Sequence, residues 1–200
     1  MIGLRGLLLS LLTLALVSGC GDDNTTNNDN GNDPTAASRT TEGWESYGRG
    51  DMTTAREKFR SAITLDAGHA PAHSGLGWAL AADDSLDAAV TAWDEALGID
   101  AGFTDAYAGK ALALFAGESP DPAGAITAAG EALSREPRYD FSMDDVDWTD
   151  LRLLLGNAYV QTGEYSSAAA QIDSLGGTSP DPSSDTYEQD IIAFLEALAN

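Results

Sequence analysis

The chain has 200 residues, 43% of them hydrophobic. Its 32 acidic residues outnumber its 10 basic ones, and the net charge of -22 disfavours nucleic acids and anionic lipid headgroups as partners because phosphates are repelled. The charge favours solubility in a salty habitat, and it could also attract a basic partner or divalent cations.

The N-terminal segment is predicted to be a signal peptide covering residues 1–19. Arg5 provides a positive charge, and the apolar run 7–17 is about eleven residues long, well short of the roughly 20 that a membrane-spanning helix needs. It is followed by Val17-Ser18-Gly19-Cys20, which resembles the lipobox of bacterial lipoproteins. Cys20 is the only cysteine, so it cannot form an internal disulfide, and we expect it to be acylated.

Acylation at Cys20 would anchor the protein to a membrane surface without spanning the bilayer. The residue after the cysteine is Gly21 and not aspartate, which by resemblance to known sorting signals favours the outer membrane of a Gram-negative cell, facing the periplasm or the cell surface.

Residues 20–35 are predicted to form a disordered tether, because they are rich in Asp and Asn and contain no aliphatic side chain to bury. The composition suggests a calcium loop, but the spacing does not fit an EF-hand. With Gly31 at the sixth position, Thr26 and Ala37 stand where the loop needs aspartate and glutamate.

From residue 36 onward the chain repeats at intervals of 34 positions. In the expected second helices, two alanines flank a bulky residue: first Ala55, Phe59 and Ala62, then Ala89, Trp93 and Ala96. In the first helices, Gly43-Trp44 recurs as Gly77-Trp78. Small residues allow two helices to cross closely, so we expect Phe59 and Trp93 to be core residues.

This pattern resembles the tetratricopeptide (TPR) repeat. The resemblance implies an all-α fold over residues 36–200, a right-handed superhelix of about four helix-turn-helix units with a C-terminal capping helix. The expected units cover about 36–69, 70–103, 104–139 and 149–178, and the capping helix covers 184–199. Unit one departs from the pattern at Glu42 and Ser46, and Glu188 is placed for a capping box at the start of the last helix.

The resemblance also implies that the first helix of each unit lines a concave groove. Carried over position by position, it assigns to that groove Trp44, Tyr47, Trp78, Leu112, Phe115 and Asn157. Rigid aromatic side chains suit the capture of a peptide, although aromatics at helical spacing are also typical of a core. No cluster of lysines is present to hold a terminal carboxylate, so an acidic C-terminal peptide is rejected as the ligand.

An insertion between units three and four contains four aspartates together with Phe141, Met143 and Trp148. We expect the aspartates to stabilise the start of the helix that follows, and the three apolar side chains to pack beneath it. The alternative is a surface for a basic, aromatic segment or a divalent cation.

Catalytic chemistry finds no support in the sequence. His69 and His73 are four apart, but Pro71 lies between them and no third metal ligand follows nearby. No nucleophile elbow, phosphate loop or dinucleotide fingerprint is present. We therefore expect a protein that is not an enzyme and uses no cofactor or metal: either a lipid-anchored scaffold that binds a protein or peptide in the groove, or an assembly subunit that uses its loops and convex face. The oligomeric state is left open.

Overall fold

The computed structural model describes residues 34–141 and 146–199, and within them the chain is almost entirely helical. The predicted signal peptide, Cys20 and the tether as far as residue 33 lie outside the described residues. The helices are α1 Ala36–Gly48, α2 Met52–Leu65, α3 Ala70–Ala81, α4 Leu86–Ile99, α5 Thr104–Ala116, α6 Pro122–Arg135, α7 Trp148–Thr162, α8 Tyr165–Ser174 and α9 Tyr187–Leu198. Two short strands, β1 Asp140–Phe141 and β2 Val146–Asp147, lie between α6 and α7.

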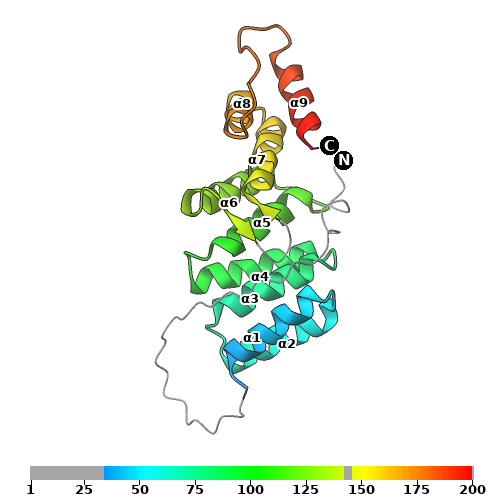
Figure 1. Cartoon of the computed structure of the whole chain (residues 1–200), viewed down its shortest axis with the longest axis vertical. Coiled ribbons are helices and arrows are strands. Elements are labelled where there is room, and N and C mark those ends of the chain that lie inside the picture. The colour runs from blue at the N-terminus through cyan, green and yellow to red at the C-terminus, as the bar shows by residue number, and fades with distance from the viewer. Residues whose placement is uncertain (1–33, 142–145, 200) are drawn as a thin grey trace.

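The helices pack as successive antiparallel pairs, α1 with α2, α3 with α4, α5 with α6 and α7 with α8, and each pair packs on the next. Figure 1 shows the resulting elongated stack, with α1 and α2 at one end and α8 and α9 at the other. The prediction of an all-α helical solenoid is confirmed.

Glycines placed one unit apart make the close helix crossings. A Cβ on Gly43 or Gly75 would come within 2.6 Å of the Phe59 ring, and a Cβ on Gly77 or Gly109 within 2.6 Å of the Trp93 ring. Phe59 is fully buried and Trp93 is 1% exposed, so the prediction that both are core residues is confirmed. Each large ring therefore fills the space between two first helices that carry no side chain at that point.

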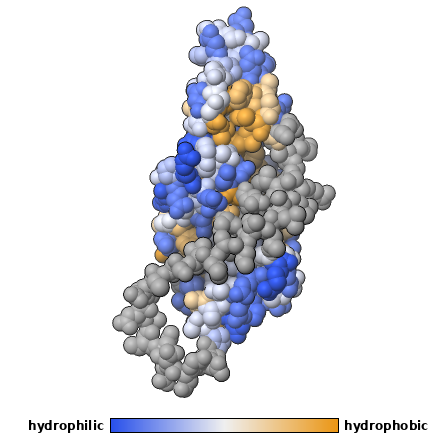
Figure 2. Space-filling model, in the orientation of Figure 1, coloured by the Kyte–Doolittle hydropathy of each residue, from blue (hydrophilic) through white to orange (hydrophobic). Residues whose placement is uncertain are grey.

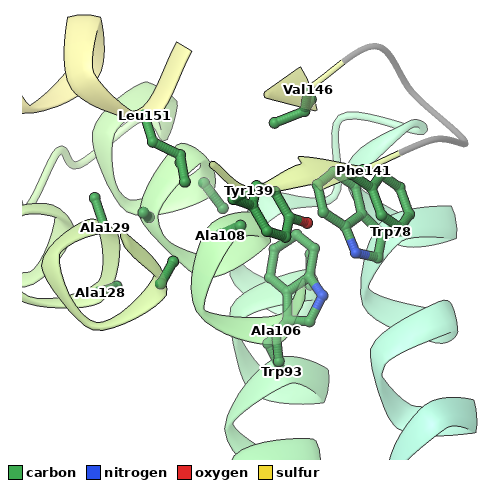
Figure 3. Close-up of a cluster of buried hydrophobic side chains, with 14 of the residues drawn as sticks. Trp78, Trp93, Ala106, Ala108, Ala128, Ala129, Tyr139, Phe141, Val146 and Leu151 are labelled. Carbon is green, nitrogen blue, oxygen red and sulfur yellow. The ribbon is translucent and has the colours of Figure 1, made fainter. Parts of the chain in front are cut away.

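Unit three has Ala129 at the position of Phe59 and Trp93, and its core is completed from outside the helix pair. Tyr139 and Leu151, both fully buried, lie in the same cluster as Ala108 and Ala129 (Figure 3). The segment after α6 thus supplies bulk that the repeat itself lacks.

The two departures of unit one from the TPR pattern have a structural explanation. The Glu42 carboxylate of α1 accepts a hydrogen bond from Lys58 Nζ of α2 at 2.5 Å and another from Arg39, and these partners lower the pKa of Glu42. The Ser46 hydroxyl, which is buried, donates to the Glu42 carbonyl at 2.9 Å. At these two positions of the first unit, hydrogen bonds take the place of the apolar contacts expected in a TPR unit.

The start of α7 agrees with the role expected for the aspartates of the insertion. Asp147 is the N-cap, and its carboxylate accepts hydrogen bonds from the backbone amides of Thr149 and Asp150. The Asp150 carboxylate in turn accepts a hydrogen bond from the Asp147 amide, which completes a capping box. The helix ends at Gly163, whose φ of 78° is left-handed.

The final helix begins later than its sequence signal suggested. α9 starts at Tyr187 with Thr186 as N-cap and without a side-chain cap, so the expected capping box with Glu188 was wrong. Ser184 instead forms a turn, in which its hydroxyl accepts from the backbone of Thr186 at 3.2 Å. Leu195 packs on Gly156 of α7, and Phe194 on Gly177 after α8, which fixes α9 at the end of the stack.

Candidate functional site

The first helices of the four units, α1, α3, α5 and α7, lie side by side and form one face of the solenoid. This is the concave face that the TPR resemblance assigns to ligands. The six predicted groove residues are distributed along it, with Trp44 and Tyr47 on α1, Trp78 on α3, Leu112 and Phe115 on α5, and Asn157 on α7.

A segment of the chain itself occupies part of this face. Strands β1 and β2 pair antiparallel, with Phe141 opposite Val146, and the Trp148 amide donates to the Tyr139 carbonyl at 2.7 Å. Figure 3 shows the Phe141 ring lying against the Trp78 ring. The two rings stack, with centroids 4.2 Å apart and planes 13° apart. Its edge contact with Trp44 is at 5.7 Å. The two-stranded ribbon is therefore seated against the first helices of units one and two.

This position differs from the one expected for Phe141. The sequence suggested that it packs beneath α7, whereas its ring contacts α1 and α3 and is 6% exposed. The reason is the pair of tryptophans, which offer flat apolar surfaces to an aromatic ring. The Trp148 ring lies under the Arg138 guanidinium at 5.5 Å, and Met143 lies outside the described residues.

The ribbon changes the environment of the predicted groove residues. Trp78 is 3% exposed and Tyr47 is 4% exposed, so in this structure both belong to the core. Trp44 is partly buried, with edge contacts to Phe59 at 5.1 Å and to Tyr47 at 5.5 Å. Their contact with a partner stays a prediction.

The other three groove residues lie nearer the C-terminal half and are only partly buried. Leu112 and Phe115 pack at the border of the core. The Asn157 side chain donates to the Leu153 carbonyl at 2.8 Å, which uses one of its amide hydrogens and leaves its oxygen as an acceptor. These three positions are partly buried, as Trp44 is, whereas Tyr47 and Trp78 are buried.

A titratable pair marks the place where the ribbon joins α5. Burial raises the pKa of the Asp105 carboxyl, and the neighbouring Tyr139 hydroxyl partly offsets that effect. Burial, reinforced by the Asp105 charge, raises the pKa of Tyr139 above its ordinary value. The carboxylate of Asp105 is thus less stable in this site than in water.

His73, one of the two histidines considered as metal ligands, makes contacts within the chain. His73 lies almost fully buried between the Ala67 carbonyl, 3.1 Å from Nε2, and the Glu95 carboxylate, 2.9 Å from Nδ1. In residues 34–141 and 146–199, no three His, Cys, Asp or Glu side chains come together as metal ligands would. His73 therefore joins α3 to the loop before it and to α4.

The positions of the ribbon and of the open C-terminal end were not predicted from the sequence. The one available signal for the ribbon was Ala129, the small residue where units one and two carry Phe59 and Trp93. A unit without its own bulky residue needs one from elsewhere, and the aromatic insertion directly follows it.

Comparison with solved structures identifies the architecture. MamA is similar at a TM-score of 0.57 and 21% identity, over 82% of this chain and 80% of that one. The TPR2B domain of yeast Sti1, solved with an Hsp70 complex, has a TM-score of 0.54 at 23% identity, over 63% of this chain and 97% of that domain. The chain has a TPR-type fold.

The first TPR of Spaghetti (RPAP3), solved with the HSP90 peptide SRMEEVD, is also similar, with a TM-score of 0.52 and 18% identity over 60% of this chain and 91% of that one. The chain matches no protein-family model and no curated protein. Among the described helices, none has the length and apolar content required to cross a bilayer.

Proposed function

We propose that this protein is a lipid-anchored scaffold of the bacterial cell envelope that binds a peptide or a partner protein along its concave face. Acylated Cys20 would hold it on the outer membrane, and residues 21–35 would carry the solenoid away from the surface by on the order of 20 Å. The proposed role is binding, without catalysis and without a cofactor.

One observation carries the binding proposal: the concave face already holds an extended segment. Phe141 of β1 contacts Trp78 and Trp44 through its ring. We expect a bound peptide to use the same kind of contact. This contact supports the proposal that the same face would receive an extended or helical ligand. The TPR structures of Sti1 and RPAP3, solved with Hsp70 and HSP90 peptides, support the same use of the fold by analogy.

The test is capture of partners from native membranes by the full chain, followed by mass spectrometry. The informative variant is Leu112→Asp combined with Phe115→Ala, because both side chains are only partly buried on α5. Loss of the partners bound by the wild-type chain is expected. The matched control is Ile99→Ala, an aliphatic residue 42% exposed at the end of α4, away from the concave face.

The anchor has its own test. Replacing Cys20 with serine should abolish labelling by an alkyne-tagged palmitate and release the protein from the membrane fraction. Retained labelling would contradict the lipoprotein assignment.

A second candidate function rests on Leu65 and Ile99, which stand 34 positions apart at the ends of α2 and α4 and are 49% and 42% exposed. Equivalent apolar residues on successive second helices suit an assembly subunit that contacts its complex through the repeat edges. Loss of partners with Leu65→Ala and Ile99→Ala, but not with the α5 variant, would favour this alternative.

A further inference from the structure

The C-terminal end of the solenoid carries apolar side chains that the other described residues leave exposed. Ile192 and Leu198 of α9 are 36% and 45% exposed, and Leu153 and Val160 of α7 are only partly buried. Figure 2 shows an apolar patch over this end, where Figure 1 places α7 and α9. We call these four residues the α7–α9 surface.

Helical spacing places these side chains beside the contact between α7 and α9. Leu153 and Val160 are seven apart on α7 and flank Gly156, the glycine on which Leu195 of α9 packs. Ile192 is one turn before Leu195 and Leu198 is one turn after it, so the two side chains lie about 120° apart around α9, one on each side of Leu195. The apolar strip therefore runs along the line where α9 meets α7, and α9 packs less closely on α8 than each earlier first helix packs on the helix before it.

The charges around this surface are almost all negative. After Trp148 the chain has a single basic residue, Arg152, whose guanidinium donates to Gln171 Oε1 at 2.9 Å. Asp185, Glu188 and Asp190 are exposed at the start of α9, and none of the three forms an ion pair within the described residues. By contrast, the first three units hold ion pairs such as Lys58 with Glu42.

We propose that the α7–α9 surface docks a basic amphipathic helix of a partner protein, with aliphatic side chains on the apolar strip and Lys or Arg beside the carboxylates of α9. The partner's helix would add to the end of the stack, in the way that each unit's first helix packs on the unit before it. A second copy of this chain fits poorly, because it would bring the same carboxylates into opposition. The inference rests on the proposed scaffold function and assigns it a partner chemistry.

We place the docking site at the C-terminal end because the two-stranded ribbon already packs on the first helices of units one and two. Phe141 packs on Trp78 and Trp44 in the first two units, whereas Ile192 and Leu198 of α9 are exposed. An exposed apolar patch bordered by charges is the usual mark of an interaction site.

The test uses a fluorescein-labelled Leu/Lys peptide of about 14 residues, roughly four helical turns, designed with one apolar face. Its binding to the full chain is followed by fluorescence anisotropy at about 150 mM salt, where exposed charges are well screened. The comparison peptides are a Leu/Glu version with the same apolar face and a Lys/Ser version without one. Only the Leu/Lys peptide should bind.

Ile192→Ser combined with Leu198→Ser should weaken binding by at least about tenfold. The matched control, Leu65→Ser with Ile99→Ser, removes two equally exposed aliphatic residues from the other half and should leave the affinity unchanged. Glu188→Gln with Asp185→Asn should weaken binding and reduce its dependence on salt. Circular dichroism shows whether each variant keeps its helix content.

Four results would overturn the proposal. The first is that the Leu/Glu or the Lys/Ser peptide binds as tightly as the Leu/Lys peptide, and the second is that the control variant loses as much affinity as the Ile192→Ser, Leu198→Ser variant. The third is that the chain binds lipid vesicles and the Ile192→Ser, Leu198→Ser variant does not, and the fourth is that the chain dimerises and this variant does not. If capture from native membranes depends on Leu112 and Phe115 but not on Ile192 and Leu198, the inference fails while the scaffold function stands.

Discussion

At the scale of single residues, large rings and the glycines that make room for them determine how the solenoid packs. Phe59 and Trp93 each lie against two glycines from successive first helices. Phe141 is the corresponding ring on the concave face, where it stacks on Trp78. Each contact joins segments that are distant in sequence, so single substitutions at these points should affect the whole array.

Phe141→Ala should destabilise the fold by about 3 kcal/mol, since it removes a buried ring and leaves Trp78 without its stacking partner. Urea unfolding followed by tryptophan fluorescence measures the change. Leu65→Ala, at an exposed position, should shift the free energy of unfolding by less than about 0.5 kcal/mol. Equal effects of the two substitutions would show that the ribbon adds nothing to stability.

Two glycine-to-alanine changes should have opposite signs. Gly109→Ala should destabilise the protein, because its Cβ would lie 2.3 Å from the Trp93 ring. Gly130→Ala on α6 meets nothing within 4 Å and should stabilise it by up to about 1 kcal/mol through helix propensity. Thermal unfolding distinguishes them, and stabilisation by both would be inconsistent with the close crossing at Trp93.

Asp105→Asn should stabilise the fold near pH 7. Burial raises the pKa of Asp105, so folding favours its protonated form, and the stability that protonation provides is lost as pH rises through the folded-state pKa. The advantage of the amide over the carboxylate should therefore be present at neutral pH and disappear below the unfolded-state pKa, where both side chains are neutral. A difference in Tm that does not depend on pH would refute this explanation.

At the scale of elements, the sequence predicted the repeated helices well and the connections poorly. The alternation of small and bulky residues was enough for the helix pairs, because packing in each pair is local and repeats at a fixed interval. The position of β1 and β2 depends on Trp44 and Trp78, which precede the ribbon by about one hundred and about sixty residues, and no spacing rule links such distant segments. The late start of α9 reflects competition from the turn at Ser184.

The cap of α7 is the element-scale feature with the clearest energetic consequence. Asp147→Ala should cost about 1 kcal/mol, because its carboxylate satisfies two backbone amides at the helix start. Ser85, the N-cap of α4, makes no side-chain capping bond, so Ser85→Ala should have little effect. Urea denaturation compares the two, and equal losses would contradict the role assigned to Asp147.

At the scale of the whole molecule, two regions of the solenoid differ in what covers them. Trp44 and Trp78 are in contact with the chain's own ribbon, whereas the end formed by α7 and α9 is apolar, acidic and open. The sequence suggested aromatic groove residues without distinguishing these parts, because burial by the ribbon is a tertiary effect. The sequence also predicted Leu112, Phe115 and Asn157 as groove residues, and these are partly exposed on the face formed by the first helices.

Site-specific photo-crosslinking in living cells tests most directly whether the concave face binds the partner. A photoreactive amino acid is placed singly at Leu112, Phe115 or Asn157, and for comparison at Leu65 or Ile99. The account predicts adducts with a common partner from the first three positions and none from the other two. Adducts confined to Leu65 and Ile99 would contradict it and assign binding to the edges of the second helices.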